Sequence, residues 1–258
     1  MPRFDHLELD SPHEDSGGRK SLQVDSQDEK HWLRMAEENR RQGLYDNALR
    51  FYSRALELDK SLVVGWLGQV QMLVAQGEYP EAELWSRKGL ELFRNNGDLM
   101  AGRAQALCRM GDTKQAHPLC DASLAQEGLT AYRWMVRGEL MIAGRSDVDR
   151  HCFDKALQLD SDWLVPLEIA LIYFHYRLPA KALQRARLAV EKASDNYFCW
   201  YVQARCELDQ GLLRQGRQSL MRCLELKPKH AEATRLLVDL DDRGWSLGRR
   251  LLGLFRRS

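Results

Sequence analysis

Apolar residues recur along this chain at helical spacing within units of fixed length. In the first unit, Ala48, Tyr52 and Ala55 lie four and three residues apart, so they share one stripe of a helix predicted over residues 47–58. The stretch before it also has the pattern of a helix. Gly43 stands between the two helices, where a left-handed residue commonly ends a helix. The pattern therefore predicts a helix-turn-helix unit.

This unit repeats every 34 residues along most of the chain. Trp32, Trp66 and Trp134 keep the interval, and Met100 fills the missing place. Glycine and alanine keep the same interval at fixed offsets, at Gly43, Gly77 and Gly111 and at Ala48, Ala82 and Ala116. Such a period indicates an array of one supersecondary unit, in which each copy buries its apolar face against its neighbours. Arrays of this kind present surfaces, so binding is expected rather than catalysis.

The order of these residues resembles the tetratricopeptide repeat family, whose pattern is Trp, Leu-Gly, Tyr, Ala, Phe, Ala and Pro over 34 residues. The resemblance extends over roughly residues 29–242. The third copy, about 97–130, loses the aromatic positions, and the turn of the fourth copy is shortened. The resemblance implies an all-α fold, a right-handed α-solenoid of about six helix-turn-helix repeats with a C-terminal capping helix.

Two tails flank the predicted solenoid of residues 28–242. Residues 1–27 are acidic and polar, so we expect a disordered tail. Residues 244–258 carry arginine as their only charged residue, and a helical projection separates the apolar and cationic side chains. The apolar side and its border hold Trp245, Leu247, Leu251, Leu254 and Phe255, and the other side holds Arg249, Arg250, Arg256 and Arg257. We expect this amphipathic helix to dock on an anionic membrane surface, to pack on the last repeat, or to lie in the groove as a self-ligand.

Composition narrows the classes of function. Lys and Arg total 38 against 37 Asp and Glu, a net charge of +1, which opposes nucleic-acid binding because phosphate neutralisation supplies most of that affinity. No stretch approaches the length of an integral membrane segment. The acidic start lacks the pattern of a secretion signal. We therefore expect a cytoplasmic protein, with peripheral membrane contact as the alternative, whose six cysteines are reduced core thiols.

No catalytic constellation is visible in the sequence. The seven histidines are dispersed, and the familiar metal, nucleophile and phosphate-loop motifs are missing. His151 beside Cys152 is the nearest approach to a reactive pair, but adjacent helical residues point about 100° apart. We expect no enzymatic activity, no cofactor and no metal site.

The resemblance also indicates where a partner would bind. In the family, the second, fifth, ninth and twelfth positions of the first helix of each repeat face a concave groove. Mapped onto this chain, these positions predict an apolar and aromatic groove through its C-terminal half. The candidate partner site comprises Leu67, Met135, Leu171, Phe174, Tyr201 and Arg205. A protein or peptide ligand is expected there, as an extended segment or an amphipathic helix; alternatively, some of these side chains pack between helices.

The same mapping argues against one role of the family. Co-chaperones that hold the acidic tail of heat-shock chaperones use lysine, asparagine and arginine at set positions of the first and third repeats. Here the corresponding residues are Leu33 and Glu37, and Asp98 and Gly102. Glu37 and Asp98 would repel a carboxylate, so a co-chaperone of this type is not expected.

Overall fold

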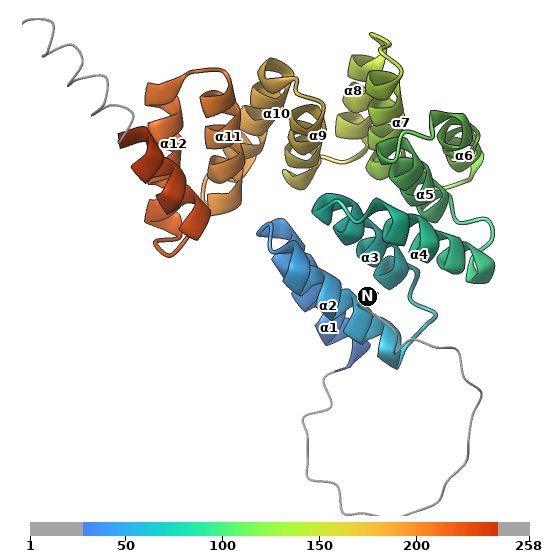
Figure 1. Cartoon of the computed structure of the whole chain (residues 1–258). Helices are drawn as coiled ribbons and strands as arrows, with labels where there is room; N and C mark the ends of the chain where they lie inside the picture. The colour runs from blue at the N-terminus through green and yellow to red at the C-terminus, as the bar shows by residue number, and fades with distance from the viewer. Residues whose placement is uncertain (1–27, 242–258) are drawn as a thin grey trace, which may run out of the picture.

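The computed structural model describes residues 28–241 and shows a curved row of helix pairs (Figure 1). A further helical segment covers residues 231–241, and no strand occurs within 28–241. The helices are α1 (Glu29–Arg41), α2 (Tyr45–Leu58), α3 (Val63–Gln76), α4 (Tyr79–Leu92), α5 (Gly97–Arg109), α6 (Thr113–Ala125), α7 (Ala131–Ala143), α8 (Asp149–Leu159), α9 (Leu164–His175), α10 (Pro179–Lys192), α11 (Tyr197–Asp209) and α12 (Leu213–Leu226). The predicted all-α repeat architecture is confirmed. The two tails predicted at 1–27 and 244–258 lie outside the described residues.

The period of the sequence corresponds to the packing of the pairs. Ala48, Ala82, Ala116 and Ala182 are completely buried, as expected for small residues where helices cross. Each odd-numbered helix packs against the even-numbered helix that follows it, and consecutive pairs stack on one another. The apolar stripes read from the sequence therefore form three buried clusters, each shared by neighbouring helix pairs.

The turns inside the pairs use left-handed residues, but not always glycine. The first three pairs have Gly43, Gly77 and Gly111 there, with φ of 69°, 86° and 87°. In the fourth and fifth pairs the left-handed residues are Arg145 and Arg177, with φ of 55° and 58°. A side chain at positive φ costs free energy, so these two turns are held by their surroundings rather than by intrinsic preference.

The end of α1 contacts the sixth pair at the beginning of α11. It also contacts the fifth pair at the beginning of α9. The Tyr197 hydroxyl donates to the Gln42 carbonyl at 2.7 Å, and the Asn196 side-chain amide donates to the Arg41 carbonyl at 3.2 Å. The Phe198 ring lies directly beside Gly43, where an added Cβ would be 2.3 Å from Phe198 Cε2. The array thus curves back on itself, a feature that the repeat pattern did not predict.

Two ion pairs reinforce this closing contact. The Arg41 guanidinium donates to both oxygens of Asp162, at 3.2 and 2.6 Å, in a bidentate pair. Arg40 Nη2 lies 2.5 Å from Glu168 Oε1 on α9. The Arg41 hydrogen bonds hold the pKa of Asp162 below its usual value although burial alone would raise it. The closing contact therefore combines a buried aromatic side chain with charge-assisted hydrogen bonds.

The six cysteines are all free and buried. Burial raises the pKa of the Cys120 and Cys199 thiols to about 12, so both remain protonated at neutral pH. This is the environment expected for core thiols.

Candidate functional site: the central groove

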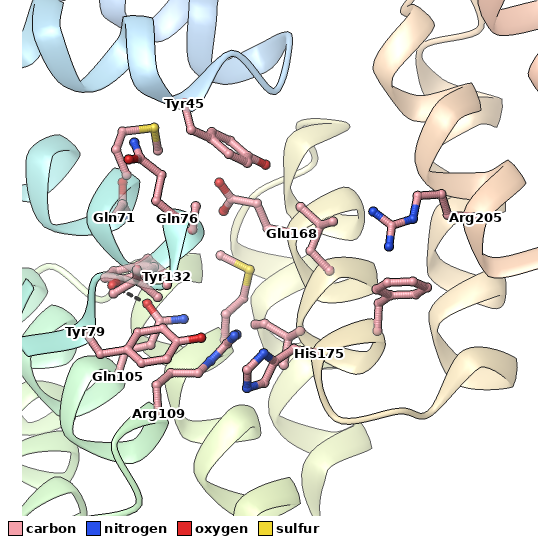
Figure 2. Close-up of a pocket in the computed structure, with 18 of the residues that line it drawn as sticks. Tyr45, Gln71, Gln76, Tyr79, Gln105, Arg109, Tyr132, Glu168, His175 and Arg205 are labelled. Atoms are coloured by element: carbon pink, nitrogen blue, oxygen red, sulfur yellow. Dashed lines mark hydrogen bonds between the residues drawn. The ribbon is translucent and has the colours of Figure 1, made fainter. Parts of the chain in front are cut away.

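The concave side of the array encloses a cavity of about 490 Å³, called the first compartment here (Figure 2). Its walls come from α3, α5, α7, α9 and α11, the first helices of five successive pairs. Tyr45 and Tyr79, which begin α2 and α4, complete the wall. The side of these helices that the family position rule assigns to a partner therefore faces this cavity.

A second compartment of about 260 Å³ lies between α1 and α9. Both compartments are lined by Gln71, Tyr132, Met135 and Glu168, so they adjoin along one groove. Glu168 at this boundary is held by Arg40 through the ion pair described above. A contact that closes the array thus also divides its groove.

A buried polar network forms one wall of the first compartment. Glu139 is completely buried, accepts a 2.7 Å hydrogen bond from the Gln105 amide and pairs with Arg109. The Tyr132 hydroxyl donates to Gln105 Oε1 at 2.8 Å. Burial alone would lower the pKa of Arg109, but the charge of Glu139 outweighs it and the pKa rises. Arg109 is therefore a permanent cation in this wall, matched by the carboxylate behind it.

Arg205 reaches into the first compartment from α11 (Figure 2), and its guanidinium lies over the ring of Phe174. Its guanidinium carbon is 4.8 Å from the centre of the Phe174 ring and 5.9 Å from that of Tyr201. Arg177 also lines the compartment. Among residues 28–241, neither Arg205 nor Arg177 has a carboxylate within ion-pair distance. The open side of this compartment therefore offers two cations beside an aromatic face.

Two further polar side chains shape the same wall. The Gln76 Nε2 atom is buried and has no hydrogen-bond partner among the described residues, and a buried donor in this state costs free energy until it is satisfied. His175 packs edge-on against Tyr79, with ring centres 6.4 Å apart. Burial, followed by the charge of Arg109, lowers the pKa of His175, which favours its neutral form at neutral pH.

The second compartment has the opposite electrostatic character. It is lined by five carboxylates, those of Glu37, Asp98, Asp160, Asp162 and Glu168, and by two arginines, Arg40 and Arg41. Behind the wall, Arg133 Nε donates to Asp98 at 2.9 Å. Asp160 is exposed and has no cation within ion-pair distance in the described part of the chain. Carboxylates therefore outnumber cations in this half of the groove even when Arg133 is counted.

Five of the six predicted groove residues line the two compartments. Leu171, Phe174 and Arg205 line the first, Leu67 lines the second, and Met135 lines both although it is only 3% exposed. Tyr201 does not line either compartment: it is 6% exposed and donates its hydroxyl to Glu232. The walls of the first compartment combine the expected apolar and aromatic side chains with charged and amide side chains that the apolar expectation did not include.

Sequence reasoning missed several polar residues of the groove. Gln105 and Arg40 occupy the ninth and twelfth positions of their first helices, so the position rule could have found them. Arg109 and Gln76 lie at the ends of α5 and α3, beyond the last position of the rule. No signal in one sequence indicates that these helix ends turn toward a shared cavity.

The described residues contain no group of three or more potential metal ligands. None of the described helices has both the length and the apolar character needed to cross a bilayer. The His151 ring packs edge-on against Trp134, with ring centres 6.4 Å apart, whereas Cys152 is 3% exposed. His151 and Cys152 therefore lie in different surroundings and do not face each other as a pair.

Comparison with known proteins agrees with this architecture. Residues 31–62 match the family model of the tetratricopeptide repeat. The curated proteins contain no sequence match to the chain. A tetratricopeptide repeat protein from Parabacteroides merdae is similar in structure, with a TM-score of 0.51 and 15% identity over 84% of this chain and 85% of that chain.

Two larger proteins share part of the fold. The human IFIT1 dimer with m7Gppp-AAAA has a TM-score of 0.52 and 18% identity, over 70% of this chain and 46% of that chain. The Cut9-Hcn1 hetero-tetramer of APC/C has a TM-score of 0.50 and 15% identity, over 83% of this chain and 43% of that chain. The chain thus spans less than half the length of either relative, and at these identities the likeness is one of fold. Residues 31–62 thus form a tetratricopeptide repeat, and the other described helix pairs are built and stacked in the same way, as in the solenoids of tetratricopeptide repeat proteins.

Proposed function

We propose that this protein is a non-enzymatic interaction scaffold that binds a short peptide segment of a protein partner in its central groove. Tetratricopeptide solenoids generally use their concave surface for binding. The observation that carries the proposal is the first compartment itself, where five successive first helices enclose about 490 Å³. Cavities of about 300–1,000 Å³ with apolar walls and a few polar groups are typical ligand sites.

The volume limits the length of the inserted segment. A helix about 10 Å in diameter with a rise of 1.5 Å per residue occupies about 120 Å³ per residue. The first compartment, at about 490 Å³, therefore holds about four residues. We infer that the part of the ligand inside the first compartment is a single turn of helix or a few extended residues, and that the rest of the ligand lies along the groove outside it.

Phe174 is the expected anchor for this ligand. Its ring is partly exposed in the first compartment, between Leu171 and the Arg205 guanidinium. Interface free energy concentrates in a few such aromatic residues, with losses of about 2 kcal/mol or more on truncation. Removing the ring should therefore weaken peptide binding about thirtyfold.

Selection from a random octapeptide display library, performed on the immobilised full chain, tests the proposal. Enriched peptides would be synthesised and titrated by fluorescence anisotropy against the unaltered protein, Phe174→Ser and Leu213→Ser. Leu213 is the matched control because it is 49% exposed on α12 and lines neither compartment. We expect Phe174→Ser alone to weaken binding. Equal affinity of the peptides for all three proteins would show that the groove is not the binding site.

A second candidate function, a membrane-recruited adaptor, rests on the sequence of residues 244–258. The four arginines there are worth about 1 kcal/mol each near an anionic leaflet, about 4 kcal/mol in total before any apolar insertion. Co-sedimentation with phosphatidylserine vesicles at low salt tests this candidate. It is lost if the full chain ignores the vesicles and the paired change Leu251→Asp, Phe255→Asp lowers the melting temperature, since that segment is then structural.

A further inference from the structure

The two compartments of the groove differ in the sign of their charge. Three arginines and one glutamate line the first compartment, whereas five carboxylates and two arginines line the second. The residues behind the walls reduce both excesses without removing them: Glu139 matches Arg109 in the first, and Arg133 matches Asp98 in the second. A single groove thus passes from a cationic half to an anionic half.

An ion pair marks the boundary between the two halves, and the charges without ion-pair partners lie on either side of it. The boundary is the Arg40–Glu168 pair, with Gln71, Tyr132 and Met135 beside it. Beyond the boundary, Arg205 and Arg177 on one side and Asp160 on the other lack an ion-pair partner among residues 28–241. A ligand that crosses the boundary therefore passes Met135 and Tyr132 beside an ion pair, and meets opposite charges at its two ends.

We infer that the groove selects an extended peptide segment that carries an acidic side chain and a basic side chain on either side of an apolar residue. The acidic side chain binds in the first compartment, near Arg205 and Arg177. The basic side chain binds in the second compartment, near Asp160. The apolar residue contacts Met135 and Leu171. This inference rests on the proposed function and specifies the ligand of the same groove.

Opposite charges at the two ends also fix the direction of the peptide. Reversing a segment would place its acidic side chain among carboxylates and its basic side chain among arginines, and like-charge contacts in a partly enclosed site are unfavourable. The groove should therefore discriminate between a peptide and its charge-swapped counterpart of the same composition. An apolar groove could not make this distinction.

The selection described above supplies the test when it is repeated with two charge variants of the full chain. Arg205→Gln removes one of the two cations of the first compartment that lack a carboxylate partner among residues 28–241, and Asp160→Asn removes the anion of the second compartment that lacks a cationic partner there. In Asp160→Asn the side-chain oxygen that accepts from the Asp162 backbone amide is retained. Matched controls are Arg187→Gln and Asp239→Asn, which remove exposed charges outside both compartments.

Peptides enriched by the unaltered protein should carry one acidic and one basic residue at a constant separation. Arg205→Gln should weaken binding of the selected peptide about tenfold, because a charge-assisted contact is lost. It should not weaken binding of the Glu→Gln analogue of that peptide, because this analogue already lacks the contact. Asp160→Asn should show the same pattern with the analogue that lacks the basic residue. The two control variants should bind like the unaltered protein.

The outcomes separate the two proposals. Peptides that depend on Phe174 but show no paired charges, or no coupling to Arg205 and Asp160, overturn the charge inference and leave the peptide site standing. Failure to recover any peptide that depends on Phe174 overturns the proposed function, and the charge inference with it.

Discussion

One methyl group at Gly43 tests whether the first helix pair is held against the last two. Gly43 has φ of 69°, and a Cβ at this position would lie 2.3 Å from Phe198 Cε2. The Phe198 side chain is 8% exposed and meets Tyr45 edge-on, with ring centres 6.1 Å apart. In Gly43→Ala the ring must therefore leave its place, or the closing contact must open.

The expected loss of stability in Gly43→Ala has two parts, which can be separated by making the same change in another repeat. A side chain in the left-handed region costs about 1–2 kcal/mol at any such turn. Gly111 occupies the same turn of the third pair with φ of 87° and has no atom within 4 Å of an added Cβ, so Gly111→Ala should show this cost alone. Exposing the buried ring of Phe198 adds about 1.5–3 kcal/mol. Gly43→Ala should therefore lose about 2.5–5 kcal/mol of stability in total.

Urea unfolding of the full chain, followed by tryptophan fluorescence, measures both losses. Small-angle X-ray scattering adds a second readout, because opening the contact should increase the radius of gyration of Gly43→Ala only. In a Phe198→Ala background the extra cost at Gly43 should disappear. If Gly43→Ala and Gly111→Ala lose the same stability within about 0.5 kcal/mol, with equal radii of gyration, the contact does not hold the array closed.

Three further predictions follow from the packing and charges. Ala82→Leu and Ala182→Leu should each overpack a helix crossing and lose about 1–3 kcal/mol in a thermal melt, and unchanged stability in both would refute the register. Glu139→Gln leaves the buried Arg109 unpaired and should cost about 3–5 kcal/mol in urea unfolding; a loss under about 1 kcal/mol would contradict a buried pair. Because the folded pKa of Asp162 lies below 3.8, its stabilisation is complete above that value and is lost as pH falls through the folded pKa. The stability difference between the unaltered protein and Asp162→Asn should therefore narrow below about pH 3.8, and a constant difference down to pH 3 would oppose this.

The helices and their register could be predicted because both depend on local sequence. The 34-residue interval identifies the turns, and the buried positions of Ala82 and Ala116 follow from spacing alone. The exceptions are turns where tertiary packing overrides local preference. In the fourth pair the left-handed residue is Arg145 rather than the neighbouring Gly144, whose φ is −79°.

The closure of the array could not be predicted because it sums small rotations over many repeats. Arg40 and Glu168 are 128 residues apart, and their meeting depends on the angle between every pair that separates them. Phe198 shows the consequence. The position rule assigns it to the ligand groove, yet the curvature brings Gly43 against it, so its ring contacts the chain itself. The same rule assigns Phe174 to the groove, and Phe174 does line the first compartment.

Closure and ligand binding should be thermodynamically linked. The second compartment has walls from both α1 and α9, so it exists only while the first pair contacts the fifth. A peptide that occupies both compartments binds the closed form, and its apparent dissociation constant rises in inverse proportion to the closed fraction. Gly43 lines neither compartment, yet Gly43→Ala should weaken binding of the selected peptides, whereas Gly111→Ala should not. Equal affinities in anisotropy titrations of these two variants would show that the ligand does not require the closed array.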